Sequence, residues 1–334
     1  MMEVKVCPST LHCGYATYSP VALRRLFDGV PVSHQLDFAF EKELNRQLIA
    51  ENMGRISVSG AQEKMSVVVE DRKIRFARAG ERGTHILKPA PFDYDLVARK
   101  QIPANEHLTM QIASQVYGII TAENGLCFDR SGHPVYITRR FDILPDGSKA
   151  RMDDLASIVG RNEQTDGKYF KYEGSYEEIA LAIKEVIPAW PVALDRFFRL
   201  MLFNYIYGNG DAHMKNFSII NTGSENQLAP AYDLLNTSLH LNGDDLGLKG
   251  GLLRSGWKSD VLEHTGHPCR TDYETFGRQI GMTSRRIEAA IKDFSVLPDK
   301  TIELVGSSFL DKKMQRKYLT IVKERLSRFN RQSE

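Results

Sequence analysis

The stretch Asp211-Ala-His-Met-Lys-Asn216 places an aspartate and an asparagine five positions apart in this 334-residue chain. An aspartate carboxylate can accept a proton from a hydroxyl group, and an asparagine amide oxygen can ligate a metal ion. The preceding segment, Leu194 to Tyr207, carries Phe and Leu on most helical faces, which is typical of a buried helix. The sequence therefore predicts a polar loop that directly follows a buried helix.

A second acidic motif, Ala229-Pro-Ala-Tyr-Asp233, follows after a predicted hairpin. Phosphoryl transfer requires a carboxylate that holds the acceptor hydroxyl, oxygen ligands for metal ions and a cation on the nucleotide phosphates. Asp211 and Asn216 match the kinase spacing of base and metal-binding amide, and Asp233 stands where a kinase places its principal magnesium ligand. The two motifs together predict a catalytic base and a metal site.

A lysine and a glutamate upstream supply the expected cation. Lys88 ends the strand-like His85-Ile-Leu-Lys stretch, and Glu106 lies near the start of the next predicted helix. This arrangement favours a phosphate-binding lysine held by a carboxylate, and the alternative is a surface lysine beside a helix-dipole glutamate.

A turn of small residues, Ser57-Val-Ser-Gly-Ala-Gln-Glu-Lys64, precedes the first strands. Its backbone amides are suited to cover phosphates, as anion-binding turns do. The expected nucleotide contacts in this turn are Ser59, Gly60, Ala61, Gln62 and Lys64.

The order of the elements predicts an α+β fold with two lobes. Short β-rich segments at 66–70, 73–76, 85–88 and 134–138 predict an antiparallel N-lobe sheet, with one helix opened by Pro103. Beyond Phe141 the pattern is mainly helical. We expect an appendage at 1–55, an N-lobe at 56–142 and a helical C-lobe at 143–334.

Composition limits the classes of partner. The formal charge of +2, from 44 basic and 42 acidic residues, predicts no general attraction to nucleic acid or anionic membranes. No apolar run of about 18 residues occurs, and Met1 to Tyr15 lacks the order of a secretory signal, so we expect a cytoplasmic protein. Cys7, His12 and Cys13 suggest half of a metal site, with ordinary buried thiols as the favoured alternative.

Taken together, the motifs resemble the HipA family of bacterial toxin kinases from about Ile56 to beyond Asn236. The segments that carry the resemblance are Ser57 to Lys64, His85 to Pro89, Asn105-Glu106, Arg140-Phe141-Asp142, Asp211 to Asn216 and Ala231-Tyr232-Asp233.

The resemblance implies a two-lobed serine/threonine kinase that uses ATP and Mg²⁺. It assigns the base to Asp211, metal ligation to Asn216 and Asp233, and phosphate binding to Lys88. It places the adenine at a hinge around Arg139 to Phe141. Further expected ATP contacts are Glu106, Arg139, Phe141, His213 and Lys215, with loop packing as the alternative for His213. Ser57 matches a serine that the family autophosphorylates, and Ser59 offers a second hydroxyl.

Family members are growth-inhibiting toxins that phosphorylate aminoacyl-tRNA synthetases, and a DNA-binding HipB-like antitoxin restrains them. The resemblance therefore implies a synthetase as protein substrate and contact with DNA only through the antitoxin. Only about 56 residues precede the turn, which resembles the short HipT type, whose missing subdomain can be a separate small HipS-like protein.

Two other classes remain open from the residues. Aminoglycoside and homoserine kinases share the Asp, Asn and later Asp, but their histidine before the base is absent, since Asn209 and Gly210 precede Asp211. A non-catalytic regulatory or co-repressor module is the second alternative, although Lys88 and both motifs are intact. Gly247 to Gly251 and Trp257 lie where a protein kinase binds its substrate.

Overall fold

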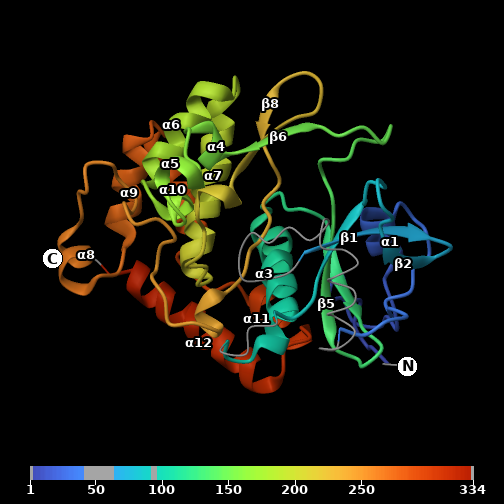
Figure 1. The fold of residues 1–334 in the computed structure, drawn as a ribbon. Coiled ribbons are helices and arrows are strands. Elements are labelled where there is room, and N and C mark those ends of the chain that lie inside the picture. Colours follow the sequence, from blue (N-terminus) through green and yellow to red (C-terminus); the bar gives the residue numbers. More distant parts are fainter. Residues whose placement is uncertain (1–2, 41–63, 92–95, 332–334) are drawn as a thin grey trace. The chain divides into compact units, whose positions relative to one another are not determined.

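The computed structural model (Figure 1) describes residues 3–40, 64–91 and 96–331. The chain divides into two compact units. Unit 1 comprises Met1–Ile112, Ala122–Phe141 and Lys300–Gln315, and unit 2 comprises Ala113–Thr121, Asp142–Asp299 and Arg316–Glu334. The predicted lobe ranges stay a prediction.

Unit 1 contains a five-stranded antiparallel sheet in the order β2-β1-β3-β5-β4. The strands are β1 (Met65–Glu70), β2 (Lys73–Phe76), β3 (His85–Lys88), β4 (Asn124–Phe128) and β5 (Pro134–Arg139). Met65 and Val67, two positions apart on one face of β1, are buried. Lys88 at the end of β3 pairs with Tyr136 of β5. The predicted antiparallel sheet is confirmed.

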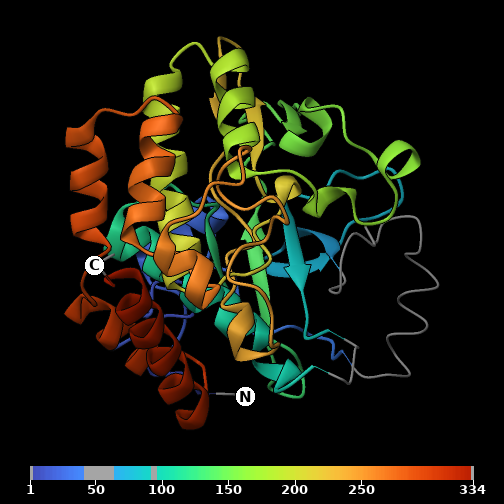
Figure 2. The ribbon, with the colours of Figure 1, turned by 90° about the vertical axis from the view of Figure 1, so that its left-hand side faces the viewer.

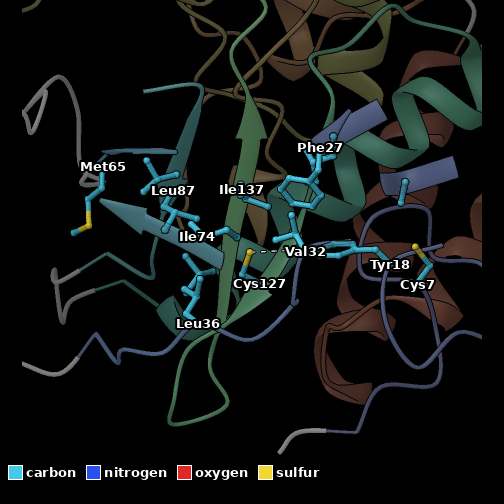
Figure 3. Packing of buried hydrophobic residues seen from close by; sticks show 14 residues of the cluster. Cys7, Tyr18, Phe27, Val32, Leu36, Met65, Ile74, Leu87, Cys127 and Ile137 are labelled. Carbon is cyan, nitrogen blue, oxygen red and sulfur yellow. Dashed lines mark hydrogen bonds between the residues drawn. The ribbon is translucent and has the colours of Figure 1, made fainter. Parts of the chain in front are cut away.

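An N-terminal segment covers part of this sheet. Ser19 caps helix α1 (Pro20–Phe27) by accepting a hydrogen bond from the Ala22 N–H, which explains why the amphipathic pattern at 19–27 becomes a helix. Phe27 and Leu26 of α1 and Leu36 beyond it join side chains of the strands in one buried cluster (Figure 3). The Cys7 sulfur accepts the Ser19 N–H within this cluster, as a buried structural thiol does.

Helix α3 (Ile102–Tyr117) begins one residue before the predicted Pro103 and ends just before Gly118, whose φ of 61° suits the residue after a helix. The short η1 helix (Arg99–Gln101) precedes it. The first turns of α3 carry buried polar side chains, among them Glu106 and His107. Buried polar groups in a helix start require partners, so this end of α3 is a candidate site.

Helices dominate unit 2, as the sequence predicts. Its main helices are α6 (Tyr176–Val186), α7 (Trp190–Ile206), α9 (Arg270–Gln279) and α10 (Ser284–Asp293). They run side by side (Figure 2), and the Phe198 ring of α7 stacks against Phe276 of α9. The Ser175 hydroxyl caps α6 by accepting the Glu178 N–H at 3.4 Å. The mixed fold class is therefore confirmed.

A small antiparallel sheet follows the order β6 (Arg151–Asp154), β7 (Ser218–Asn221), β8 (Asn226–Leu228). The remaining elements are α4 (Leu155–Ile158), α5 (Glu163–Asp166), η2 (Phe170–Tyr172), η3 (Met214–Asn216), η4 (Thr237–Leu239), α8 (Asp260–Thr265), α11 (Asp299–Ser307) and α12 (Lys312–Phe329). Across the part of the chain that is described, no helix has the length and apolarity needed to cross a bilayer.

Candidate active site

Unit 1 contributes a buried ion pair. The Lys88 ammonium donates to Glu106 Oε1 at 2.5 Å, and the two side chains are only 5% and 2% exposed. The ammonium also lies 5.2 Å from the centre of the Tyr136 ring. Strand β3 and helix α3 thus hold a desolvated cation at a fixed position. The alternative of a surface lysine beside a helix-dipole glutamate is wrong.

The other expected nucleotide contacts of unit 1 lie apart from this pair in sequence. Arg139, at the end of β5, bonds to the Asp28 carboxylate at 2.6 Å. Phe141 follows β5 and is half-buried, as is Lys64 before β1. Ser57, Ser59, Gly60, Ala61 and Gln62 lie outside the described residues.

The Asp211 loop of unit 2 starts in a tight turn after α7. The Asn209 N–H donates to the Asn204 carbonyl, and the Asp211 N–H donates to Asn209 Oδ1 at 3.3 Å. Gly210 passes close to another segment, since a Cβ there would stand 2.2 Å from the Asp244 carbonyl oxygen. The end of the buried helix therefore presents Asp211 at the surface, where its carboxylate is exposed.

His213 and Asn216 close the loop. The His213 N–H donates to Asn216 Oδ1 at 3.2 Å, and the Asn216 N–H donates to the His213 carbonyl at 2.9 Å. Burial lowers the pKa of His213 to about 4, and the carboxylates of Asp211 and Asp233 both oppose that shift. Its Nδ1 atom is buried and has no hydrogen-bond partner among the described residues. A neutral imidazole thus lies within the field of both acidic residues.

Asp233 has a backbone φ of 56°, in the left-handed region. Residues other than glycine adopt this conformation at a cost, and such strain is concentrated at functional sites. The neighbouring Tyr232 hydroxyl donates to the Lys215 carbonyl at 2.9 Å and lies 2.6 Å from Ser218 Oγ. Tyr232 therefore ties the Asp233 segment to the Asp211 loop. The sequence motif included Tyr232 but gave no sign of this role.

The Lys215 ammonium pairs with a carboxylate of strand β6. Its ammonium bonds to Asp154 Oδ2 at 2.7 Å, and Asp154 also accepts the Ser157 N–H at the start of α4. Lys215 therefore anchors the loop to β6 and α4. Its predicted contact with ATP stays a prediction.

Two tyrosines support the loop without any signal in the sequence. The Tyr172 hydroxyl donates to Asp211 Oδ1 at 2.9 Å, and the Tyr172 and His213 rings meet edge to face at 5.2 Å. The Tyr176 hydroxyl donates to the Ala212 carbonyl at 2.8 Å and accepts the Gly247 N–H at 3.0 Å. Tyrosines 39 and 35 positions before the aspartate have no motif that would reveal these contacts.

A glycine-rich segment at residues 247–254 pairs with residues 172–177. Backbone bonds join Lys249 N–H to the Tyr172 carbonyl and Gly250 N–H to the Gly174 carbonyl, both at 2.9 Å. Tyr172, Gly210 and this segment line a pocket of about 570 Å³, together with Trp257, which is 45% exposed. The expected substrate region therefore borders the Asp211 loop.

Comparisons with known proteins identify the family of the chain. The family described as the HipA-like C-terminal domain matches residues 56–300. The chain belongs to this family.

Relatives of this HipA-like chain include kinases. A Haemophilus influenzae protein provisionally named a kinase is 27% identical over 319 residues, which cover 88% of this chain and 87% of that protein. The serine/threonine-protein kinase toxin HipA of Shewanella oneidensis is 29% identical over 203 residues, which cover 56% of this chain and 44% of the toxin.

Solved structures share the HipA-like fold. Shewanella oneidensis HipA, determined with HipB and its operator DNA, matches with a TM-score of 0.64 at 19% identity, covering 87% of this chain and 71% of that one. The Helicobacter pylori proinflammatory kinase CtkA matches with a TM-score of 0.51 at 13% identity, covering 82% and 93%. The predicted family and the predicted kinase fold are confirmed.

The donor set of the HipA-like chain fits a hard divalent cation. Asn216 and Asp233 offer oxygen ligands, and the described ranges contain no group of three or more His, Cys, Asp or Glu side chains suited to a metal. Mg²⁺ is commonly held by one or two protein oxygens, with phosphates and water as its other ligands. These two protein ligands would suit a Mg²⁺ ion that binds together with a nucleotide.

Proposed function

We propose that this protein is an ATP- and magnesium-dependent protein serine/threonine kinase that acts as the toxin of a bacterial toxin-antitoxin system. The observation that carries the proposal is the hydrogen-bonded connection of the Asp211 loop to the Asp233 segment through Tyr232. This connection supports the proposal because it links the segment of the candidate base to the segment of a candidate metal ligand, and phosphoryl transfer needs both.

Each residue has a proposed role. Asp211 accepts the proton of the attacking hydroxyl, because its carboxylate is exposed at the end of a buried helix. Lys88 binds nucleotide phosphates, and Glu106 keeps its ammonium charged and oriented despite burial. Asn216 and Asp233 would hold Mg²⁺, which supplies charge neutralisation at the phosphates when it is bound.

The proposed nucleotide contacts also include residues whose part is less direct. Glu106 acts through Lys88, while His213 and Lys215 shape the loop around the phosphates. Arg139 and Phe141 border the adenine, and the 57–64 turn covers the phosphates. Autophosphorylation at Ser57 or Ser59 adds about two negative charges to that turn and competes with ATP for its amides.

The proposed substrate is an aminoacyl-tRNA synthetase, whose phosphorylation blocks translation in the cytoplasm. The proposed restraint is a DNA-binding HipB-like antitoxin, with a separate small HipS-like protein as a further partner. Support comes from the Shewanella oneidensis relative, whose solved structure contains HipB and operator DNA.

The test is intact-mass spectrometry with site mapping after incubation with magnesium-ATP and a bacterial extract. The wild-type protein is compared with Asp233→Gln, which keeps the side chain polar but removes its charge. Asp233-dependent phosphate on Ser57 or Ser59 and on a synthetase is the expected result. Phosphate on a metabolite alone would indicate a small-molecule kinase, and ATP binding without any transfer would indicate a regulatory module.

A further inference from the structure

The hydroxyl of Tyr172 lies where the proposed base would receive a substrate. A kinase base accepts a hydrogen bond from the acceptor hydroxyl before the proton moves. Here Asp211 Oδ1 already accepts such a bond at 2.9 Å, and its donor is the Tyr172 phenol. One carboxylate oxygen of the base is thus engaged by the chain itself.

The phenol is held in place from several sides. The Lys171 ammonium lies 4.9 Å from the centre of the Tyr172 ring, and the His213 ring contacts it edge to face. Burial, and then the nearby Asp211 carboxylate, raise the pKa of Tyr172 above its ordinary value, so the phenol keeps its proton and stays a donor. The hydrogen bond from Tyr172 to Asp211 is therefore supported by the surrounding side chains.

The same tyrosine is joined to the glycine-rich segment 247–254. Its carbonyl accepts the Lys249 N–H at 2.9 Å, and the Lys249 ammonium bonds to Glu173 at 2.5 Å. Tyr172 also lines the 570 Å³ pocket that this segment forms. A polypeptide bound in this pocket would therefore contact Tyr172.

We infer that Tyr172 occupies the acceptor position at Asp211 in the resting protein, and that a protein substrate bound along residues 247–254 displaces it. This inference rests on the proposed kinase function. The device makes access to the base depend on docking in the pocket, so that water, which makes no such contact, is a poor acceptor. Tyr172 is then a specificity-determining residue that competes with water for Oδ1 of the base.

The kinetic test measures magnesium-ATP hydrolysis, with water as the acceptor, in the wild type and in Tyr172→Phe. Losing one hydrogen bond to a carboxylate should raise the hydrolysis rate roughly three- to tenfold. The affinity for ATP, measured by calorimetry, should not change. Tyr169→Phe is the matched control, because Tyr169 is a neighbouring tyrosine with a side chain that is 60% exposed.

A stability cycle tests the contact without any turnover. Tyr172→Phe should lower the thermal midpoint by about 2–4 °C in the wild type and by much less in an Asp211→Ala background. Equal losses in both backgrounds would show that no such bond exists in solution.

Two kinetic results and one mapping result would overturn the inference. A lower hydrolysis rate in Tyr172→Phe would make the tyrosine a positioning residue for Asp211, and an unchanged rate would make it a packing residue. Phosphate mapped to Tyr172 itself would make it an acceptor. If both proteins bind ATP but neither turns it over, the kinase proposal fails as well, while the stability cycle still reports on the contact.

Discussion

The Lys88–Glu106 pair shows how burial changes the energetics of an ion pair. An exposed lysine and glutamate contribute little to stability, because water screens them. Here both side chains are almost fully buried, so each ion has lost its hydration and interacts with the opposite charge instead. A charge held in this way is ready to meet a phosphate without further reorganisation.

Glu106→Gln should lower the free energy of unfolding by about 3–5 kcal/mol, because the Lys88 ammonium stays buried and loses the charge of Glu106. Urea denaturation measures this loss. The matched control is Asp37→Asn, which breaks the exposed pair with Lys73 and should change the free energy of unfolding little.

The double variant Lys88→Met, Glu106→Leu separates stability from function. It should recover most of the lost stability, because apolar side chains replace both ions, and yet hydrolyse no ATP. Nucleotide turnover by this variant would show that Lys88 has no role with phosphates.

The sequence predicted this pair only as one of two options. Strand and helix patterns placed Lys88 and Glu106 at an element end and an element start, but neither pattern reports burial. Burial depends on the packing of β3 beside β5 and on the position of α3, which are properties of the folded unit.

At the scale of elements, close backbone approach explains the glycine at 247. A Cβ on Gly247 would stand 2.6 Å from the Ala212 nitrogen, beside the proposed base. The glycine-rich segment and the Asp211 loop therefore touch through their backbones.

Gly247→Ala should push the Asp211 loop out of position, lower the free energy of unfolding by about 1–3 kcal/mol and reduce phosphoryl transfer at least about tenfold. Binding of ATP, measured by calorimetry, should change little. Gly243→Ala is the control, since nothing lies within 4 Å of a Cβ at that position. Equal activity of the two variants would mean that the close approach has no catalytic consequence.

Trp257 offers a large exposed aromatic surface at the pocket, and such side chains contribute strongly to protein recognition. Trp257→Ala should reduce phosphorylation of proteins in a bacterial extract roughly tenfold and leave ATP binding unchanged. Leu241→Ala removes another exposed apolar side chain, 52% exposed, and serves as the control. An equal loss of ATP binding and protein phosphorylation would argue against a substrate role.

At the scale of the whole molecule, each unit contains a histidine that burial keeps neutral. His107 of α3 is fully buried, its Nε2 donates to the Ser9 carbonyl at 2.8 Å, and burial lowers its pKa to about 4. Burial lowers the pKa of His213 in unit 2 to about 4 as well. Both units are therefore expected to be sensitive to acid.

The sign follows from proton binding. An unfolded histidine titrates near 6.5, so between about pH 6.5 and 4 the unfolded chain binds more protons than the folded one. The contribution of each neutral histidine to the free energy of unfolding is fully present above the unfolded pKa. About 3 kcal/mol of it per histidine is lost by pH 4. Urea denaturation from pH 7 to 4.5 should show this decline, which His107→Gln should flatten and His12→Gln, at an exposed position, should not.

The sequence by itself determined the class of fold, the family and the order of the chemical groups. Period-two and helical patterns report local burial, and capping residues mark helix starts. The Asp211 motif and the Asp233 motif are each a continuous stretch of sequence. None of these signals depends on contacts between distant residues. Tertiary structure alone decided that Lys88 and Glu106 are buried together, that Tyr232 joins the two acidic segments and that Tyr172 bonds to Asp211. These contacts join residues 17 to 39 positions apart in hydrogen bonds that no local spacing encodes, because only the packing of the elements brings their side chains within reach.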